Sequence, residues 1–300
     1  CVFQTPIVRA MKGGKKRYFY SLPEYESCDA VKGWTIKYYK GLGTSTNQEA
    51  KEYFKAIDKH KIVFDASNNS NALILAFDKL KAPERKQWLA NVPGDAGLVQ
   101  VKNVDEFVHK ELILHSLADN VRSIANLMDG LKPSQRKILF ACLKRNLTNE
   151  IKVNQLAGYV SEHTDYHHGE ASLVQAIIHM AQHFRGANNL PLLQDNGQFG
   201  TRLLGGKDHA SGRYIFTKLS PITRDIFHID DDPILPTTEH EPLFYAPVVP
   251  MVLVNGCKGI GTGWACCIPR YDVHTVVSCV RRWLNQQVLE EPLPSNASSM

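Results

Sequence analysis

The sequence has no apolar run approaching the roughly 20 residues that a membrane-spanning helix requires. Its first ten residues also lack the basic and then apolar order of a secretory signal peptide. These two absences predict an intracellular protein. With 300 residues, 43% of them hydrophobic and 22% charged, the chain is long enough for about two globular domains. The disordered and fibrous classes are excluded.

Cysteines are few and are poorly spaced for a disulfide or metal framework. The seven cysteines are odd in number and include no CxxC pair. This pattern argues against both a disulfide scaffold and a zinc ribbon. We therefore expect reduced, mostly buried thiols.

The glycine signatures of mononucleotide sites are also absent. The segment around Gly41 and Gly43 has the order strand, glycine turn and helix, with the helix expected over 46–57, but neither GxGxxG nor GxxxxGK occurs there. The N-terminal amides of that helix could hold an anion. With Lys37 and Lys40 beside the turn, a contact to a nucleic-acid backbone and a plain structural turn both remain open.

Local patterns outline the first third of the chain. They predict a β-hairpin across 1–20, a hairpin or loop over 61–77, where a polar tract separates two short apolar runs, and a helix over 104–117. Residues 93–97 (PGDAG) form the first candidate linker. We place a domain boundary near residue 110.

The segment 120–183 is rich in helices and in basic residues. Pro133 stands at a first helical position, and a second amphipathic helix follows Gly169. Helix, turn and helix with basic residues on the exposed side is typical of DNA docking, whereas a three-helix core with a solvated charged face is the alternative. The basic residues on or beside these helices are Arg122, Lys132, Arg136, Lys137, Lys144 and Arg145.

Several histidines of this segment have the spacing of candidate metal ligands. They are His163, His167 and His168, or His179 with His183, but the last pair lacks the Glu of HExxH and lies on an amphipathic helix. We therefore predict no metal site here. His167 and His168 stand beside a glycine and are interpreted as phosphate contacts.

Glycine and positive charge gather from Gly197 to Phe216, in the stretch GQFGTRLLGGKDHASGRYIF. Its glycines allow close approach of the backbone to a ligand, and Arg202, Lys207 and Arg213 suit an oxyanion such as phosphate. A phenol beside a guanidinium and a phosphate favours covalent catalysis, in which Tyr214 attacks phosphorus. A tyrosine that simply opens a strand is the alternative.

Six motifs span nearly the whole chain. They are YKGLGTST (39–46), MDGLKPSQRKIL (128–139), QLAG (155–158), YHHGE (166–170), DNGQFGTRLLGGKDHASGRYIF (195–216) and VNGCKGIGTGW (254–264). In content and order they resemble the breakage-reunion core of eukaryotic-type DNA topoisomerase II, a type IIA topoisomerase.

The resemblance implies a multidomain fold of α/β plus α+β type. It implies the C-terminal part of a Toprim domain with a linker over 1–110, a winged-helix (helix-turn-helix) DNA-cleavage domain over 111–232, and the beginning of a tower domain over 233–300. The implied activity is transient double-strand DNA cleavage by tyrosine transesterification, through a 5′-phosphotyrosyl intermediate. Strand passage would then relax supercoils and decatenate DNA.

The resemblance also implies roles for particular residues. Tyr214 matches the DNA-cleaving tyrosine, and Arg213, His167 and His168 complete the expected catalytic set. Ile260 matches an isoleucine that inserts between base steps as a wedge. The other residues expected to contact DNA, by resemblance or by their positive charge, are Lys40, Arg122, Lys132, Arg136, Lys137, Arg202 and Lys207.

Other parts of the family pattern fall outside these residues. The Toprim glutamate and AspXxxAsp motif that hold Mg²⁺ are missing, as is the ATPase domain, so Mg²⁺ and ATP are expected cofactors with sites elsewhere. The start without methionine and the end at Met300 predict an excerpt, and the missing metal ligands and ATPase domain predict that it is inactive alone. The expected partners are double-stranded DNA and a second copy in a homodimer, with no membrane, in the nucleus or alternatively an organelle. Segments 93–97 and 225–241 look unlike better-known animal and yeast members, which predicts a divergent eukaryotic source.

Two other classes of protein fit part of the pattern. A non-catalytic winged-helix regulator would explain the basic helices but not a cation-lined glycine loop that ends in Tyr214. A meiotic-type double-strand-break protein shares a Toprim domain and a tyrosine, but it would carry the tyrosine before the Toprim domain.

Overall fold

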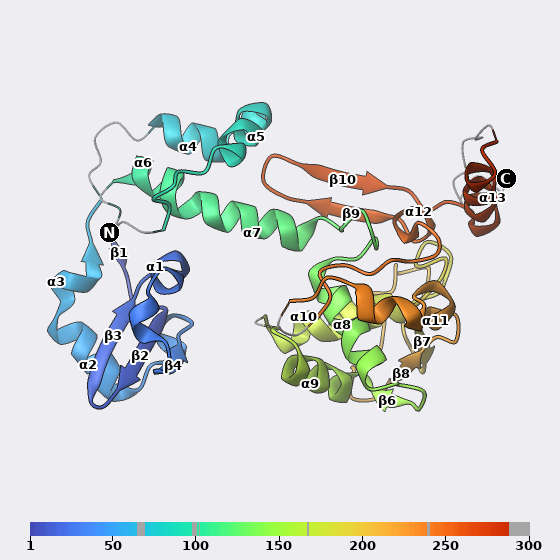
Figure 1. The fold of residues 1–300 in the computed structure, drawn as a ribbon, viewed down its shortest axis with the longest axis horizontal. Helices are drawn as coiled ribbons and strands as arrows, with labels where there is room; N and C mark the ends of the chain where they lie inside the picture. Colours follow the sequence, from blue (N-terminus) through green and yellow to red (C-terminus); the bar gives the residue numbers. More distant parts are fainter. Residues whose placement is uncertain (65–69, 98–100, 102, 167, 239–240, 288–300) are drawn as a thin grey trace. The chain divides into compact units, whose positions relative to one another are not determined.

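A computed structural model describes residues 1–64, 70–97, 101, 103–166, 168–238 and 241–287 (Figure 1). The chain divides into two compact units, Cys1–Asp119 with Thr262–Trp264 and Asn120–Gly261 with Ala265–Met300. Among the helices described, none combines the length and apolarity needed to cross a membrane. The domain boundaries expected at 110 and 232 stay predictions.

The first unit is built around a small antiparallel sheet and a group of short helices. Its elements are β1 (Val2–Phe3), β2 (Val8–Lys12), β3 (Lys15–Phe19), α1 (Leu22–Glu26), η1 (Asp29–Val31), β4 (Thr35–Tyr38), η2 (Gly41–Thr44), α2 (Asn47–Lys55), α3 (Ile57–His60), β5 (Lys61–Ile62), α4 (Ser70–Phe77), η3 (Lys79–Lys81), α5 (Ala82–Ala90), α6 (Val104–Glu106), the π-helical η4 (Phe107–Leu112) and α7 (Ile113–Ser123), which continues into the second unit.

Strands β2 and β3 form the predicted hairpin, and β4 pairs with the other edge of β2 (Figure 1). The turn between β2 and β3 uses Gly13 and Gly14, whose φ angles are +55° and +78°. Val8 lies opposite Phe19, and both side chains enter a small core with Val31. The sequence prediction for this segment is confirmed.

The prediction for 61–77 was wrong. Instead of a hairpin or loop, β5 pairs with β1 and Ser70–Phe77 forms helix α4. A short apolar run carries no periodicity that separates a strand from a buried helix, and its Ala and Leu residues are strong helix formers. Ala72 of this helix packs in a second core with Trp88 and Ile113. The polar residues 65–69 lie outside the described residues.

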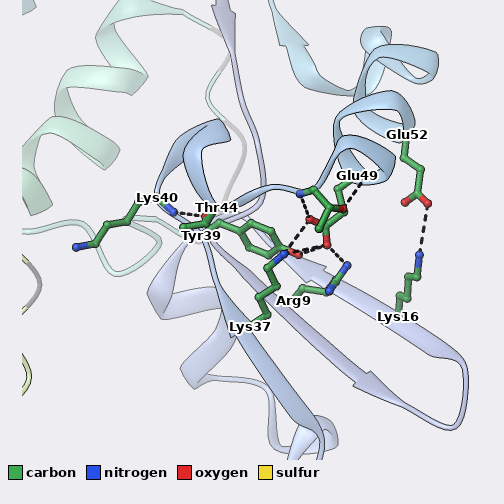
Figure 2. Close-up of polar contacts among 9 residues, drawn as sticks. Arg9, Lys16, Lys37, Tyr39, Lys40, Thr44, Glu49 and Glu52 are labelled. Carbon is green, nitrogen blue, oxygen red and sulfur yellow. Dashed lines mark hydrogen bonds and ion pairs between the residues drawn. The ribbon is translucent and has the colours of Figure 1, made fainter. Parts of the chain in front are cut away.

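A buried carboxylate ties the sheet to helix α2, as Figure 2 shows. Glu49 forms an ion pair with Arg9 of β2, and its Oε2 lies 2.9 Å from Nζ of Lys37 on β4. The Tyr39 hydroxyl donates to Oε1 at 2.8 Å, and the Thr46 amide donates to Oε2 at 2.7 Å. This amide at the start of α2, where an external anion was expected, is therefore taken by the chain's own Glu49.

These contacts shift the titration of both acidic groups. Burial by itself raises the pKa of Glu49, but the hydrogen bonds from Thr46, Lys37 and Tyr39 and the charge of Arg9 outweigh it and lower the pKa to about 2. Burial and the hydrogen bond to Glu49 raise the pKa of Tyr39. Glu49 is therefore ionised in the folded chain at any pH near neutrality.

The second unit combines helices α8 to α10 with a three-stranded antiparallel sheet in the order β6-β8-β7. Its elements are α8 (Pro133–Lys144), β6 (Ile151–Lys152), α9 (Val153–His163), α10 (Glu170–Ala181), β7 (Leu193–Asn196), β8 (Phe216–Leu219), α11 (Thr223–Ile226), η5 (Ile229–Ile234), α12 (Met251–Val254), β9 (Cys257–Ile260), β10 (Ala265–Ile268) and α13 (Val273–Leu284).

One hydrophobic core runs through this second unit. Ile138, Leu156 and Ile177 represent the three helices in it, and all are fully buried. The same core reaches Tyr245 and Val276, well beyond the last strand of the three-stranded sheet. The helices predicted to begin at Pro133 and after Gly169 are confirmed.

The seven cysteines are all free of disulfides, as predicted, but most of them are not buried. Only Cys142 is buried, while Cys1 and Cys267 are exposed and the others are half-buried. The expectation failed because Cys257, Cys266 and Cys267 lie on the two-stranded ribbon of β9 and β10. A ribbon of two strands is too narrow to bury both of its faces.

We predict that the free energy of unfolding falls as the pH drops from 4.5, the ordinary pKa of Glu49, to its folded value of about 2. A depressed folded pKa gives stability that is complete above the unfolded pKa and is lost through the folded one. Glu49→Gln should cost about 3 kcal/mol at pH 7 and flatten this pH dependence. Urea titrations across pH measure both effects.

Glu52→Gln is the matched control, because Glu52 lies on the same helix and forms only an exposed ion pair with Lys16. It should change the free energy of unfolding by less than about 1 kcal/mol. If Glu49→Gln loses stability between pH 4.5 and about 2 as the wild type does, Glu49 is not the source of this pH dependence.

Candidate nucleic-acid interface

Tyr214 lies in a tight turn directly before strand β8. Its amide donates to the Ser211 carbonyl at 2.9 Å, and its side chain is 64% exposed. The next residue, Ile215, is buried in the core. The chain therefore anchors its apolar neighbour inside the unit and displays the phenol to solvent.

The first turn of helix α9 holds this loop in place. The Val153 amide donates to the Ile215 carbonyl at 3.1 Å, and the Asn154 amide donates to the Gly212 carbonyl at 3.2 Å. These amides at a helix start have no partner within the helix, so the loop satisfies them. A Cβ on Gly212 would lie 2.3 Å from Asn154 Oδ1 and 3.0 Å from Cγ1 of Val174, so a larger residue would displace these side chains.

Arg213 is exposed beside the tyrosine. Its guanidinium carbon lies 4.7 Å from the centroid of the Tyr214 ring, which is within the range of a cation–π contact. Within the described part of the chain, Arg213 has no ion pair and the Tyr214 hydroxyl has no hydrogen bond. Both groups therefore remain available to a ligand.

The glycine-rich loop is closed by a buried glutamine. Gln182 donates from Nε2 to the Phe199 carbonyl at 2.7 Å and to the Gly206 carbonyl at 3.2 Å. A Cβ on Gly206 would lie 2.3 Å from that same Nε2. The closed loop presents Arg202 and Lys207 to solvent, and neither has an ion pair in the described residues.

Three of the predicted residues line one cavity of about 440 Å³ in the second unit: Arg122, Lys137 and His168. His168 is exposed and contacts the ring of Tyr166 edge-on, with centroids 5.6 Å apart. His167, the other histidine of the expected catalytic set, lies outside the described residues. The cavity is thus lined by basic side chains from α7 and α8, by a histidine of the segment before α10, and by Asp165.

Two of the predicted cations are already engaged within the fold. Arg136 is buried and donates from Nε to Asp129 Oδ2 at 2.7 Å and from a terminal nitrogen to Asp129 Oδ1 at 3.0 Å. Lys137 forms a half-buried ion pair with Glu241. The DNA contacts expected of Arg136 and Lys137 stay predictions, and the structure assigns both side chains internal partners.

Sequence reasoning missed these partners. Asp129 lies in the motif that carries Arg136, so an acid one turn before a basic helix was a usable signal. Glu241 is more than one hundred positions from Lys137, and Gln182 lies at the end of an ordinary amphipathic helix. No local pattern identifies either of them.

The β9–β10 hairpin carries the predicted wedge residue. Ile260 ends β9 opposite Ala265 and is 73% exposed. Lys132, at the start of α8, donates from Nζ to the Lys258 carbonyl on the same strand at 2.9 Å. The side chain of Ile260 is therefore free to contact a ligand, while Lys132 supports the strand behind it.

Lys40 belongs to the first unit and is described separately from the residues above. Its side chain is exposed, and its amide donates to Thr44 Oγ1 at 3.0 Å (Figure 2). The neighbouring Tyr39 is buried on Glu49. The turn thus has a structural anchor and also a cation directed to solvent.

The prediction that these histidines hold no metal stays a prediction. His183 Nδ1 lies 2.9 Å from Asp195 Oδ2. Burial lowers the pKa of His179, and the charge of His209 adds a smaller effect in the same direction. Among the residues that the structure describes, no three His, Cys, Asp or Glu side chains gather in a way that could hold a metal ion.

The fold and the site together define a winged-helix protein with an exposed tyrosine after a glycine-rich loop. The family model for the A subunit of DNA gyrase/topoisomerase IV matches residues 122–295, and the model for the C-terminal associated domain of TOPRIM matches residues 3–120. The chain therefore belongs to the type IIA DNA topoisomerases, in their eukaryotic topoisomerase II form.

Individual relatives agree with this assignment. The chain is 50% identical to DNA topoisomerase 2 of Candida albicans and 49% identical to DNA topoisomerase 2-alpha of Homo sapiens, over 97% of its own length in each case. It spans 21% of the length of each of these relatives. The solved DNA-binding, cleavage and re-ligation domain of Plasmodium falciparum topoisomerase II matches 97% of this chain and 42% of that one, with 47% identity and a TM-score of 0.76.

We predict that Arg136→Ala lowers the free energy of unfolding by about 3 to 5 kcal/mol, because it leaves the fully buried Asp129 carboxylate without its counter-ion. Lys132→Ala is the matched control at the start of the same helix. Its exposed bond to the Lys258 carbonyl should be worth about 1 kcal/mol. Chemical denaturation followed by circular dichroism measures both values, and similar losses in the two variants would contradict the internal role of Arg136.

Proposed function

We propose that this chain is the breakage-reunion core of a type II DNA topoisomerase, and that Tyr214 is its nucleophile. The observation that carries the proposal is the exposed phenol on a loop fixed by α9, with the Arg213 guanidinium 4.7 Å from its ring. The names of the relatives, which include topoisomerase 2 and a cleavage and re-ligation domain, support it.

The proposed reaction is a transesterification. The Tyr214 oxygen forms a bond to a backbone phosphorus and loses its proton, while the bond from phosphorus to the 3′ oxygen breaks and leaves a 3′-hydroxyl. One phosphodiester replaces another, so the step reverses without added energy. Arg213 stabilises the charge that develops on the phosphoryl oxygens, with His168 and His167 as the proposed further donors.

The proposed grip on DNA uses the exposed cations. Arg202 and Lys207 on the glycine-rich loop, Arg122 beside the cavity and Lys40 on the first unit contact phosphates, which position the duplex without reading its sequence. Arg136, Lys132 and Lys137 act chiefly by holding the surface in shape, through their bonds to Asp129, to the Lys258 carbonyl and to Glu241.

Ile260 is proposed as the wedge. Inserting an apolar side chain between base steps costs a few kcal/mol of unstacking and permits a bend that brings more protein onto the DNA. An exposed isoleucine at the end of a two-stranded hairpin has the reach for this role.

The remaining parts of the proposal concern groups outside these residues. Mg²⁺ would supply charge neutralisation at the transferring phosphate, and ATP would drive the passage of a second duplex through the break. The described residues contain no cluster suited to Mg²⁺, and the proposed steps involve only this chain's own side chains. We further propose a homodimer that acts in the nucleus, with Toprim-associated, winged-helix and tower regions divided near residues 110 and 232.

We predict that Tyr214→Phe, in the full-length protein, abolishes covalent protein–DNA adducts because the attacking oxygen is removed. DNA affinity should change by no more than about twofold, as for a surface substitution. Denaturing gels of end-labelled DNA detect the adduct. Tyr159→Phe, a tyrosine on α9 whose ring stacks on His163, is the control and should retain it. Adducts that persist in Tyr214→Phe would refute the assignment.

We predict that Ile260→Ala reduces DNA bending far more than DNA affinity. Without an inserted side chain the base step stays stacked, so energy transfer between dyes at the two ends of a duplex should fall toward that of free DNA. Ile234→Ala is the control, because Ile234 is 78% exposed but lies on η5. Equal transfer efficiency in wild type and Ile260→Ala would exclude the wedge.

A further inference from the structure

Two cysteine thiols meet across the β9–β10 hairpin. Cys257 Sγ lies 3.2 Å from Cys266 Sγ. In the strand register Cys257 stands opposite Ile268 and Cys266 opposite Gly259, so the two thiols are diagonal neighbours on one face of the ribbon. The opposite face carries Lys258, Ile260, Ala265 and Cys267.

We propose that Cys257 and Cys266 form a dithiol modification site, which a peroxide converts into an intramolecular disulfide across the hairpin. The two sulfurs are 3.2 Å apart and need about 2.05 Å for a bond, so each moves by well under an ångström.

The chemistry balances with the peroxide as the only co-reactant. The Cys266 thiolate attacks one peroxide oxygen, the O–O bond breaks, and the products are a sulfenic acid and, after proton uptake, water. The Cys257 sulfur then attacks the sulfenic sulfur, loses its proton, and displaces a second water. The two sulfurs give up two electrons in total, and the peroxide accepts them.

The surroundings assign each thiol its step. Burial, followed by the hydrogen bond to Cys266, raises the pKa of Cys257 to about 11, so this thiol stays protonated near neutral pH. Cys257 is therefore the resolving sulfur. It also lines a cavity of about 470 Å³ with Lys132 and Arg270.

Exposure alone would select different thiols. Cys267 is exposed on the opposite face of the same strand, and Cys1 is exposed at the start of the chain, whereas the proposed pair is half-buried. An oxidant that simply followed accessibility would attack Cys267 and Cys1. The short distance between their sulfurs selects Cys257 and Cys266 instead. Oxidation controlled by exposure and oxidation controlled by distance therefore modify different cysteines.

The test treats the fully reduced 300-residue chain with hydrogen peroxide, alkylates the remaining thiols and maps non-reduced peptides by mass spectrometry. We expect one Cys257–Cys266 peptide, an intact mass lower by two hydrogen atoms, and full reversal by dithiothreitol. Cys266→Ser should abolish the crosslink, and Cys267→Ser should form it at the wild-type rate. A disulfide that includes Cys267, or sulfinic and sulfonic products without a crosslink, would overturn the proposal.

A second measurement follows the hairpin itself. A crosslink near the open end of the ribbon should slow backbone hydrogen exchange in β9 and β10 on oxidation, with no slowing in Cys266→Ser. Unchanged exchange in an oxidised, crosslinked sample would show that the bond leaves the hairpin unconstrained and would count against its role as a modification site. Any effect of the crosslink on DNA bending by Ile260 would depend on the proposed function. Formation of the disulfide itself does not depend on it.

Discussion

One buried ion pair fixes the frame on which the proposed DNA surface is built. The fully buried Asp129 accepts two hydrogen bonds from Arg136 and further bonds from the amides of Leu131 and Tyr245. It thereby joins the turn before α8, helix α8 and the segment after η5. The adjacent Gly130 has φ +69°, and a Cβ there would lie 2.6 Å from the backbone of α12, the helix that leads into β9. Helix α8 and the start of the hairpin are therefore positioned by the same few contacts.

This arrangement divides the cations into two groups. A guanidinium paired inside the fold cannot leave its carboxylate for a phosphate without exposing a buried charge, which costs several kcal/mol. A solvated cation gives up only water and counter-ions when it meets DNA. Arg136 is in the first group, and Arg202, Lys207 and Arg213 are in the second. The count of basic residues in the sequence thus overstates the number of phosphate contacts that the surface can make.

Sequence reasoning predicted the parts of the site that depend on local chemistry. The hairpin at Gly13 and the helix starts at Pro133 and after Gly169 follow from turn residues and spacing, whereas for Tyr214 the local pattern left a catalytic residue and a strand-opening tyrosine both open. It missed Asp129 as the partner of Arg136 although both lie in one motif, and it could not find Glu241 as the partner of Lys137, because pairing over 104 positions leaves no trace in a short window. The sequence analysis also misassigned α4, because a short apolar run is compatible with a strand and with a helix.

The loop that carries Tyr214 is held by contacts that do not use the side chains of Tyr214 or Arg213. The loop is fixed by backbone bonds from Val153 and Asn154, by the absence of a side chain at Gly212, and by burial of Ile215. None of these contacts involves the side chain of Tyr214 or Arg213. The folding contacts therefore fix the path of the backbone and leave both reactive groups without internal hydrogen-bond or ion-pair partners among the described residues. A phenol displayed in this way is pre-organised for the proposed attack on phosphorus, because the contacts that position it do not have to be broken when a ligand binds.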